Sequence, residues 1–269
     1  MSPCVRRVAA QANAVAASDS ATSPPSLPLD SIVCGDNCEV TQTFPASCID
    51  LVVTSPPYDG LRSYGGATWS FEGVASQLYR VLKDGGVIVW NVGDQVIEGS
   101  ESGTSFEQAL AFKRLGLRLH DTMIYKKTGG GNLETYRYYQ GFEYVFILSK
   151  GQPKAFNPIC DRPNEYVVNR ADESGERKKM GRRYNIWEYP NGGGHMGDCG
   201  DHEAPMPEGL ARDHILSWSN EGDIVLDPFS GSGTTAKMAK HNGRRFIGIE
   251  VNPRYCEIAE QRLAQNVLF

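Results

Sequence analysis

Apolar positions along the chain follow two alternating spacings. Short apolar runs bounded by glycine, proline or polar residues predict buried strands at residues 49–54, 87–92, 119–125, 144–148, 224–227 and 245–250. Apolar residues three and four apart predict helices at residues 71–82, 105–115, 208–218 and 234–241, with a last helix from residue 253. This alternation is typical of an α/β protein in which helices cover both faces of a mostly parallel sheet.

Two regions break the alternation. Residues 1–30 are rich in alanine, serine and proline and contain no aromatic residue, a composition that predicts a disordered tail. Residues 150–200 contain glycine, proline, asparagine and charge with little periodicity, and this stretch is too long for an ordinary connection within a domain. We therefore expect a tail at 1–30, one domain built from residues 31–149 and 201–269, and a functional insertion at 150–200 between these two halves.

The composition, with 40% hydrophobic and 22% charged residues, is that of an ordinary globular protein. No apolar run approaches the roughly 18 residues that a membrane-spanning helix needs, so we expect no membrane association. Seven cysteines, an odd number without a Cys-x-x-Cys pair, predict a reducing, cytoplasmic location. His195, Cys199 and His202 have a spacing seen in metal sites, but no fourth ligand is evident and we expect no metal.

The net charge of −5 at first argues against a nucleic-acid partner. Between residues 150 and 184, however, nine basic residues stand against five acidic ones, a local charge of +4 in a chain whose remainder carries −9. This basic island is a candidate DNA-binding face, although an ordinary solvated loop gives the same count. The candidate DNA-binding residues within it are Arg177, Lys178, Lys179, Arg182 and Arg183.

A glycine-rich turn follows the strand predicted at 224–227 and opens the next helix. Its sequence, Asp-Pro-Phe-Ser-Gly-Ser-Gly-Thr-Thr, places Gly231 and Gly233 where a ligand can approach backbone N–H groups. Glu250, nineteen residues after Gly231, ends the next predicted strand and is suited to accept hydrogen bonds from ribose hydroxyls. The pattern also fits a relaxed dinucleotide-binding fingerprint, or a plain glycine turn before a buried helix.

A second motif, Thr-Ser-Pro-Pro-Tyr at residues 54–58, stands at the end of a predicted strand. The same Thr-Ser-Pro-Pro string occurs at residues 22–25 without a strand before it or an aromatic residue after it, so the strand and Tyr58 carry the information. Pro56 and Pro57 fix the backbone, which lets a carbonyl of Ser55 or Pro56 point outward as an acceptor. Acceptors beside an aromatic ring suit the amino group of a nucleobase extruded from a duplex. A rigid proline turn with a core-packed tyrosine is the structural alternative.

Together the two motifs resemble those of the amino-group DNA methyltransferases of the permuted class often called beta, in which the acceptor motif precedes the cofactor loop. The similarity spans nearly the whole chain from about Ser31. It implies an α/β fold of the S-adenosylmethionine-dependent methyltransferase (Rossmann-like) type with a circularly permuted motif order. It further implies a catalytic half at 31–149, a target-recognition insertion at 150–200, a cofactor-binding half at 201–269, S-adenosylmethionine as cofactor and double-stranded DNA as partner.

The motifs and the resemblance assign the site residues. The predicted catalytic residues are Ser55, Pro56, Pro57 and Tyr58. The predicted cofactor-binding residues are Asp36, Asp227, Phe229, Ser230, Gly231, Ser232, Gly233, Thr234 and Glu250. Asp36 enters because only nineteen residues follow Glu250, so we expect residues 31–36 to supply the strand that completes the cofactor site. A nicotinamide enzyme would carry its second half after the glycine loop, which disfavours that alternative.

The prediction of which base atom is methylated depends on one residue. In the family that this chain resembles, serine at the first position of the catalytic motif is associated mainly with N4 of cytosine and aspartate with N6 of adenine, so Ser55 favours cytosine. Adenine N6 is the alternative, and methylation of RNA or protein glutamine is a more distant one. The resemblance implies a bacterial or phage protein associated with the nucleoid. It leaves open the recognised sequence, a restriction partner and whether the protein is a monomer or a homodimer.

Overall fold

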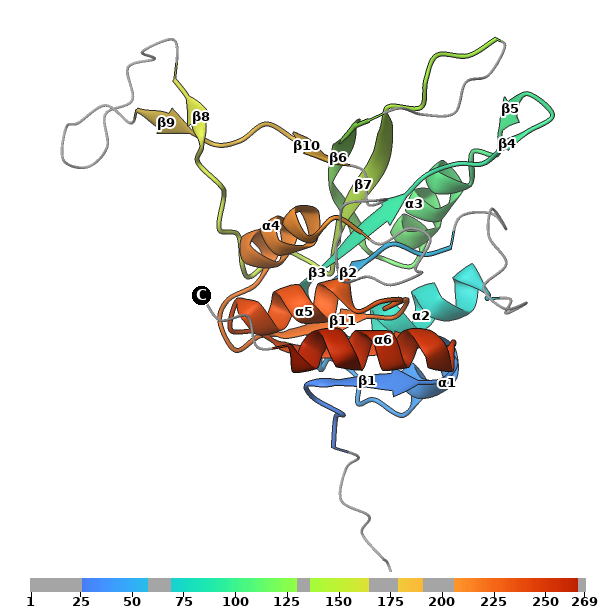
Figure 1. The fold of residues 1–269 in the computed structure, drawn as a ribbon, viewed down its shortest axis with the longest axis vertical. Coiled ribbons are helices and arrows are strands. Elements are labelled where there is room, and N and C mark those ends of the chain that lie inside the picture. Colours follow the sequence, from blue (N-terminus) through green and yellow to red (C-terminus); the bar gives the residue numbers. More distant parts are fainter. Residues whose placement is uncertain (1–25, 58–68, 130–135, 165–178, 191–205, 266–269) are drawn as a thin grey trace, which may run out of the picture.

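The computed structural model describes residues 26–57, 69–129, 136–164, 179–190 and 206–265. Within these ranges an eight-stranded sheet forms the centre of the molecule, with strand order β1-β12-β11-β2-β3-β7-β6-β10 (Figure 1). Every neighbouring pair is parallel except the two pairs that β7 makes with β3 and β6. The predicted mostly parallel α/β sheet is confirmed. The strands are β1 (Ser31–Cys34), β2 (Ile49–Thr54), β3 (Leu82–Val92), β6 (Arg118–Thr128), β7 (Phe142–Ser149), β10 (Ile186–Pro190), β11 (Ile224–Asp227) and β12 (Arg245–Glu250).

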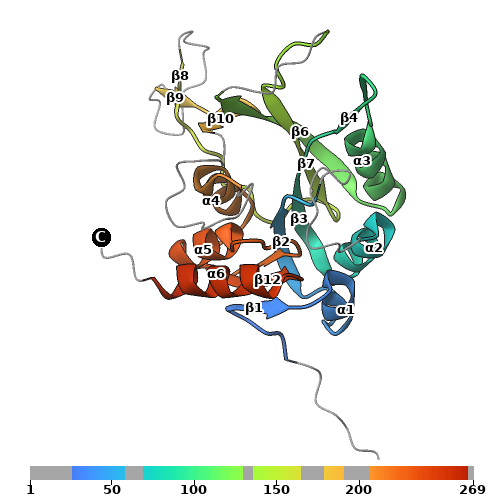
Figure 2. The ribbon, with the colours of Figure 1, turned by 45° about the vertical axis from the view of Figure 1, so that its right-hand side comes forward.

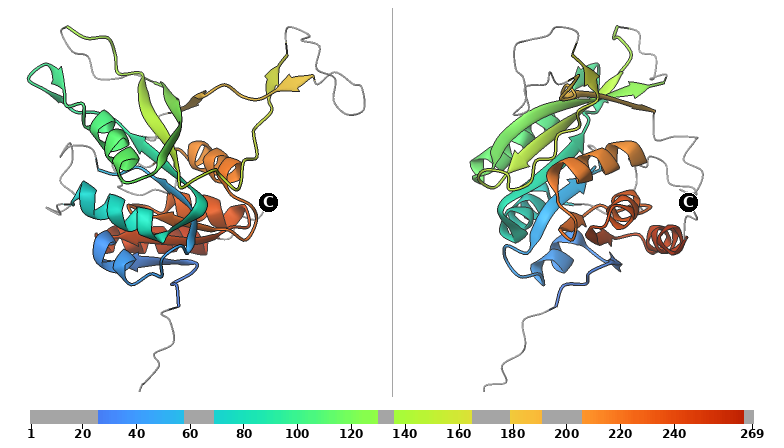
Figure 3. Two further views of the ribbon diagram at one scale, coloured as in Figure 1. Left: turned by 180° about the vertical axis from the view of Figure 1, so that it is seen from behind. Right: turned by 90° about the vertical axis from the view of Figure 1, so that its left-hand side faces the viewer.

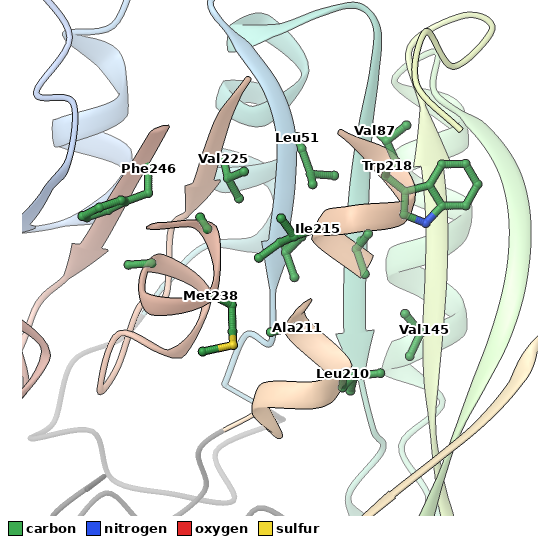
Figure 4. Close-up of a cluster of buried hydrophobic side chains, with 14 of the residues drawn as sticks. Leu51, Val87, Val145, Leu210, Ala211, Ile215, Trp218, Val225, Met238 and Phe246 are labelled. Atoms are coloured by element: carbon green, nitrogen blue, oxygen red, sulfur yellow. The ribbon is translucent and has the colours of Figure 1, made fainter. Parts of the chain in front are cut away.

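Helices cover both faces of the sheet (Figures 2 and 3). The described helices are α1 (Asn37–Gln42), α2 (Phe71–Val81), α3 (Thr104–Arg114), α4 (Glu208–Trp218), α5 (Thr234–His241) and α6 (Pro253–Ala264). One apolar cluster packs α2 and α3 against the sheet, and a second packs α4, α5 and α6 against its other face. Figure 4 shows the second cluster, in which Ile215 of α4 lies near Leu51 of β2 and Met238 of α5 lies near Ala211 of α4. Because Val52 points into the first cluster and Leu51 into the second, β2 is buried on both faces, and its centre, residues 51–53, is an unbroken apolar run.

Most predicted elements are present with bounds close to those expected. The predicted strands at 49–54, 224–227 and 245–250 and the predicted helices at 208–218 and 234–241 match β2, β11, β12, α4 and α5 residue for residue. The helix α2 ends at Val81, one residue before the predicted end, and β3 begins at once with Leu82, five residues before the predicted strand. Gly85 is needed within β3: its φ is 82°, and a Cβ there would lie 2.4 Å from Cγ of Lys154.

The segment from 150 to 200 departs from the irregular structure expected of it. Residues 186–190 form β10, which extends the main sheet by pairing in parallel with β6, from Ile186 opposite Ile124 to Pro190 opposite Thr128. Two short strands, β8 (Arg162–Pro163) and β9 (Met180–Gly181), pair with each other away from the main sheet (Figure 1). The pattern missed β10 because an edge strand of five residues buries little: Trp187 is its one fully buried side chain.

Within the described residues the structure has neither a membrane-spanning helix nor a candidate metal site. None of the helices in these ranges is long and apolar enough to cross a membrane. Across the same ranges, no group of three or more histidine, cysteine, aspartate or glutamate side chains is placed to hold a metal ion. His195, Cys199 and His202 lie outside the described residues, as does the tail at 1–25.

Candidate active site

The strands that carry the two motifs lie side by side. β11 pairs with β2 in parallel, with Val225 opposite Leu51, so both strands end at the same edge of the sheet. At that edge the buried hydroxyl of Thr54 donates to Oδ1 of Asp227 at 2.7 Å. This bond joins the residue before Ser55 to the first residue of the glycine loop. Two motifs more than 170 positions apart in the sequence therefore form one site.

The glycine loop is a tight turn held by hydrogen bonds. The amide of Phe229 donates to Oδ1 of Asp227 at 3.0 Å, and the amide of Ser230 donates to the backbone of β12 at 2.9 Å. Gly231 and Gly233 have φ values of 51° and 80°, in the left-handed region that disfavours other residues. The loop ends as the N-terminus of α5, where the first amides of a helix have no partner within the helix and are available to a ligand.

The carboxylate of Glu250 is built into this loop. Its Oε2 accepts from the amide of Gly231 at 2.9 Å, and its Oε1 accepts from the amide of Asn252 at 2.8 Å. Burial, which leaves Glu250 only 9% exposed, raises the pKa of its carboxyl. Each carboxylate oxygen has a second lone pair beyond the amide that it already accepts, so Glu250 retains acceptor sites for a ligand.

The strand expected to complete this site is present. This strand, β1, was predicted within residues 31–36 and spans residues 31–34; it pairs in parallel with β12, and Cys34 lies opposite Glu250. Asp36 follows at the same edge, where its Oδ1 accepts from the amides of Cys38 at 2.8 Å and Glu39 at 3.0 Å and so caps α1. This capping role, and the short helix α1 itself, were not predicted.

The turn at residues 55–57, which belongs to the second motif, follows β2 directly and lies next to the glycine loop. Ser55 and Pro57 are half-buried and Pro56 is buried. Tyr58 lies outside the described residues, so its predicted place beside a substrate stays a prediction. The ring of Phe229 packs into an aromatic cluster, with its centroid 5.0 Å from that of Trp69 and 6.4 Å from that of Trp90. Phe229 thereby anchors the loop by packing.

Comparison with known proteins places this site in a family. The family described as DNA methylase matches residues 49–261, well over half of the chain. The chain belongs to this DNA methylase family. It is 52% identical to the orphan methyltransferase M.BamHII of Bacillus amyloliquefaciens over 82% of its own length and 90% of that protein.

Two solved structures share the fold of the methylase. TTHA0409 of Thermus thermophilus, determined in complex with S-adenosyl-L-methionine, is 26% identical with a TM-score of 0.60, over 87% of this chain and 94% of that one. The PvuII DNA methyltransferase, described as cytosine-N4-specific, is 22% identical with a TM-score of 0.67, over 88% and 87% of the two chains. The chain is thus an S-adenosylmethionine-dependent DNA methyltransferase, and it acts on cytosine N4 or adenine N6.

The predicted DNA-binding residues of the methylase fall into different surroundings. Lys179 and Arg182 are exposed, whereas Arg177 and Lys178 lie outside the described residues. Arg183 is half-buried: its guanidinium pairs with Asp161 and, at 2.8 Å, with Asp213 of α4. Because two carboxylates already neutralise it, Arg183 ties this segment to α4 and has little left to offer a phosphate group.

Sequence reasoning missed Arg262, a buried residue of α6 whose hydrogen bonds hold the glycine loop of the methylase in place. Arg262 of α6 is 1% exposed, and its Nη1 donates to the carbonyl of Ser232 at 2.6 Å and to the hydroxyl of Thr234 at 3.2 Å. Its Nη2 pairs with Glu208 of α4 at 2.8 Å, and Glu208 also pairs with Lys237 of α5 at 2.9 Å. The one available signal was spacing, since Arg262 stands on the α6 face that also buries Cys256 and Ala259.

Asp227 makes the folding stability of the methylase depend on pH. Burial raises the pKa of Asp227 to about 6, against the hydrogen bonds from Thr54 and Phe229 that lower it. The folded protein therefore binds this proton more tightly than the unfolded chain does. The resulting stability is fully present below the ordinary pKa of about 4 and is lost as the pH rises through about 6.

We accordingly expect Asp227→Asn to remove a pH-dependent part of the unfolding free energy. Between pH 4.5 and 7 the wild type should lose about 2 kcal/mol relative to the variant. Urea unfolding at a series of pH values measures this difference. Asp84→Asn, at an exposed position, is the control and should keep the wild-type profile. Parallel profiles for wild type and Asp227→Asn would contradict a titration of Asp227 in this range.

Proposed function

We propose that this methylase transfers the methyl group of S-adenosylmethionine to N4 of a cytosine that has been flipped out of duplex DNA. The hydrogen bond between Thr54 and Asp227 carries the proposal, because it fixes the turn at Ser55 beside the glycine loop at one edge of the sheet. A donor site and an acceptor site held together in this way suit a direct transfer between two bound molecules.

The glycine loop and Glu250 form the proposed cofactor site. The amides at the start of α5 and the left-handed backbone at Gly231 form a turn that suits close approach of a ligand. Gly233 instead lets the turn pack against α6, where a Cβ would lie 2.8 Å from Cβ of Ala259. Glu250, buried but with acceptor capacity left, is assigned to the ribose hydroxyls. Asp36, at the end of the adjoining strand, is assigned to the adenine side of the site. When bound, S-adenosylmethionine supplies an electrophilic methyl group on a sulfonium.

The turn at Ser55 acts on the acceptor. The lone pair of a base amino group is delocalised into the ring, and acceptors placed at its N–H hydrogens favour localisation of that lone pair on nitrogen. The hydroxyl of Ser55 and the carbonyl of Ser55 or Pro56 are these acceptors, on a backbone held rigid by two prolines. The ring of Tyr58 is assigned to stack on the flipped base.

The choice of cytosine N4 rests on Ser55, since a hydroxyl stands where a carboxylate favours adenine. Adenine N6 remains the alternative, because either group accepts a hydrogen bond from an amino N–H. The segment between β7 and α4 is assigned to recognition of DNA. Its paired strands β8 and β9 project from the body of the molecule with Lys179 and Arg182 exposed nearby (Figure 1).

The methylated base is identified by expressing the protein in cells that lack DNA amino methylation. We expect mass spectrometry of the hydrolysed DNA to find N4-methylcytosine, and direct sequencing of modified bases to find it at one short sequence. Tyr58→Ala should lower the rate of methylation about 5- to 150-fold, since stacking on aromatic side chains contributes about 1–3 kcal/mol for each base. N6-methyladenine as the product would establish the alternative, and full activity of Tyr58→Ala would overturn the role of that ring.

A further inference from the structure

We propose that Asn91 and Glu143 are positioning residues that orient the hydroxyl of Ser55 for methyl transfer. Nδ2 of Asn91 lies 3.5 Å from Oγ of Ser55 and donates to Oε2 of Glu143 at 2.7 Å. Oε1 of Glu143 pairs with Nζ of Lys127 at 2.7 Å. This inference rests on the role proposed for Ser55 and names the side chains that act through it.

The reversed direction of β7 explains why these residues meet. Asn91 and Lys127 lie near the carboxyl ends of β3 and β6, which reach the same edge as the end of β2. β7 runs antiparallel between β3 and β6, so its beginning lies at the edge where the parallel strands end. Glu143, the second residue of β7, is thereby brought to the catalytic edge from a part of the chain 52 residues beyond Asn91.

The chemistry of the pair fixes the direction of the hydrogen bonds. An ionised carboxylate only accepts hydrogen bonds, so the Asn91 amide must turn its NH₂ group toward Glu143. The same NH₂ group then donates to the oxygen of Ser55 and occupies one of its lone pairs. This contact holds the Ser55 hydroxyl in place at the edge of the sheet where a base amino group is proposed to bind.

Burial makes this arrangement rigid. Asn91 is 3% exposed, and the side chains of Glu143 and Lys127 are 14% and 24% exposed. In such surroundings water competes poorly for the amide, and the Lys127 ammonium offsets the charge of Glu143 beside the site. A second ion pair provides a contrast: Lys83 binds Asp50 at 2.7 Å and joins the beginnings of β3 and β2, at the opposite edge of the sheet.

The test is a double-mutant cycle read by single-turnover methyl transfer to duplex DNA. We expect Asn91→Leu and Glu143→Ala each to lower the rate about tenfold, while the Kd values for S-adenosylhomocysteine and DNA stay within about twofold of wild type. Glu143→Gln, which keeps an acceptor for Asn91, should restore most of the rate. In a Ser55→Ala background, Asn91→Leu should cost nothing further, because its effect passes through the missing hydroxyl.

Controls and contrary outcomes separate this inference from the function on which it rests. Lys83→Met removes an ion pair between β2 and β3 at the far edge, and its rate should equal that of the wild type. If Asn91→Leu does not fold, Asn91→Ser replaces it, and its rate is compared in the wild-type and Ser55→Ala backgrounds in the same way. An equal loss from Asn91→Leu with and without Ser55 would overturn the positioning role alone. An unchanged rate for Ser55→Ala would overturn the role of Ser55 and this inference with it.

Discussion

Glu250→Ala is expected to weaken S-adenosylhomocysteine binding about a hundredfold, as measured by isothermal titration calorimetry. Hydrogen bonds to a charged group contribute about 1.5–3 kcal/mol each, and the loss of both ribose contacts therefore amounts to about 3 kcal/mol. The variant also removes the acceptor that holds the amides of Gly231 and Asn252, so the loop itself loses two bonds. Glu250→Gln keeps one oxygen acceptor, so its affinity for S-adenosylhomocysteine should lie between those of Glu250→Ala and the wild type.

The control for this measurement is Glu257→Ala, on the exposed face of α6 seven residues further on. It removes the same charge from the same region and should leave the affinity within about twofold of wild type. An unchanged affinity for Glu250→Ala would contradict the assignment of Glu250 to the ribose. An equal loss in both variants would instead point to the net charge of the region.

The arrangement of the glycine loop and Glu250, which we assign to the cofactor, could be predicted because its geometry is local. A strand, a glycine turn and a helix follow one another directly in the chain, and the next strand returns to lie beside the first. The spacing from Gly231 to Glu250 then suffices to place the carboxylate at the loop, where a hydrogen bond of 2.9 Å joins them. The strand before Ser55 was recognisable for the same reason, as a mainly apolar run that two layers of helices bury.

The features that sequence reasoning missed depend on contacts between distant parts of the chain. Arg262 looks like an ordinary charged residue of an amphipathic helix until α6 is packed against the glycine loop 28–30 residues away. Glu143 meets Asn91 only because β7 runs against its neighbours. β10 is recognisable as a strand only from its pairing with β6 in the folded sheet. Spacing places Arg262 on the buried face of α6 but does not show what it contacts, and the other two contacts leave no periodic pattern in the sequence.

One edge of the sheet therefore gathers the described residues of the candidate site. The ends of β2, β11, β12 and β3 deliver Ser55, Asp227, Glu250 and Asn91, and the beginning of β7 delivers Glu143. Because ligands of open α/β sheets bind beyond the carboxyl ends of the parallel strands, a permuted order of motifs along the chain leaves the geometry of such a site intact. What must be preserved is the packing that holds the loops in place.

Arg262→Leu tests that packing, and we expect it to lower the free energy of unfolding by about 3 kcal/mol. Removing one partner of a buried ion pair leaves the other partly unpaired, which typically costs about 3–5 kcal/mol. The lower end applies here because Glu208 is 35% exposed and keeps its bond to Lys237 at 2.9 Å. Urea unfolding measures the loss. Arg114→Leu, in the exposed last turn of α3, is the matched control and should change stability by less than about 0.5 kcal/mol.

Cofactor binding should respond to Arg262 as well, although no ligand contact is assigned to it. Nη1 of Arg262 holds the carbonyl of Ser232 at 2.6 Å, and without it the turn between Gly231 and Gly233 has fewer bonds to keep its left-handed backbone in place. We expect affinity for S-adenosylhomocysteine to fall about tenfold in Arg262→Leu under conditions in which the protein is fully folded. Arg262→Lys retains the positive charge but lacks the two separate NH₂ groups of a guanidinium. It should therefore recover most of the ion pair with Glu208 but only part of the affinity for S-adenosylhomocysteine. Full affinity in a destabilised Arg262→Leu protein would mean that the loop keeps its shape through Glu250 and Asp227 alone.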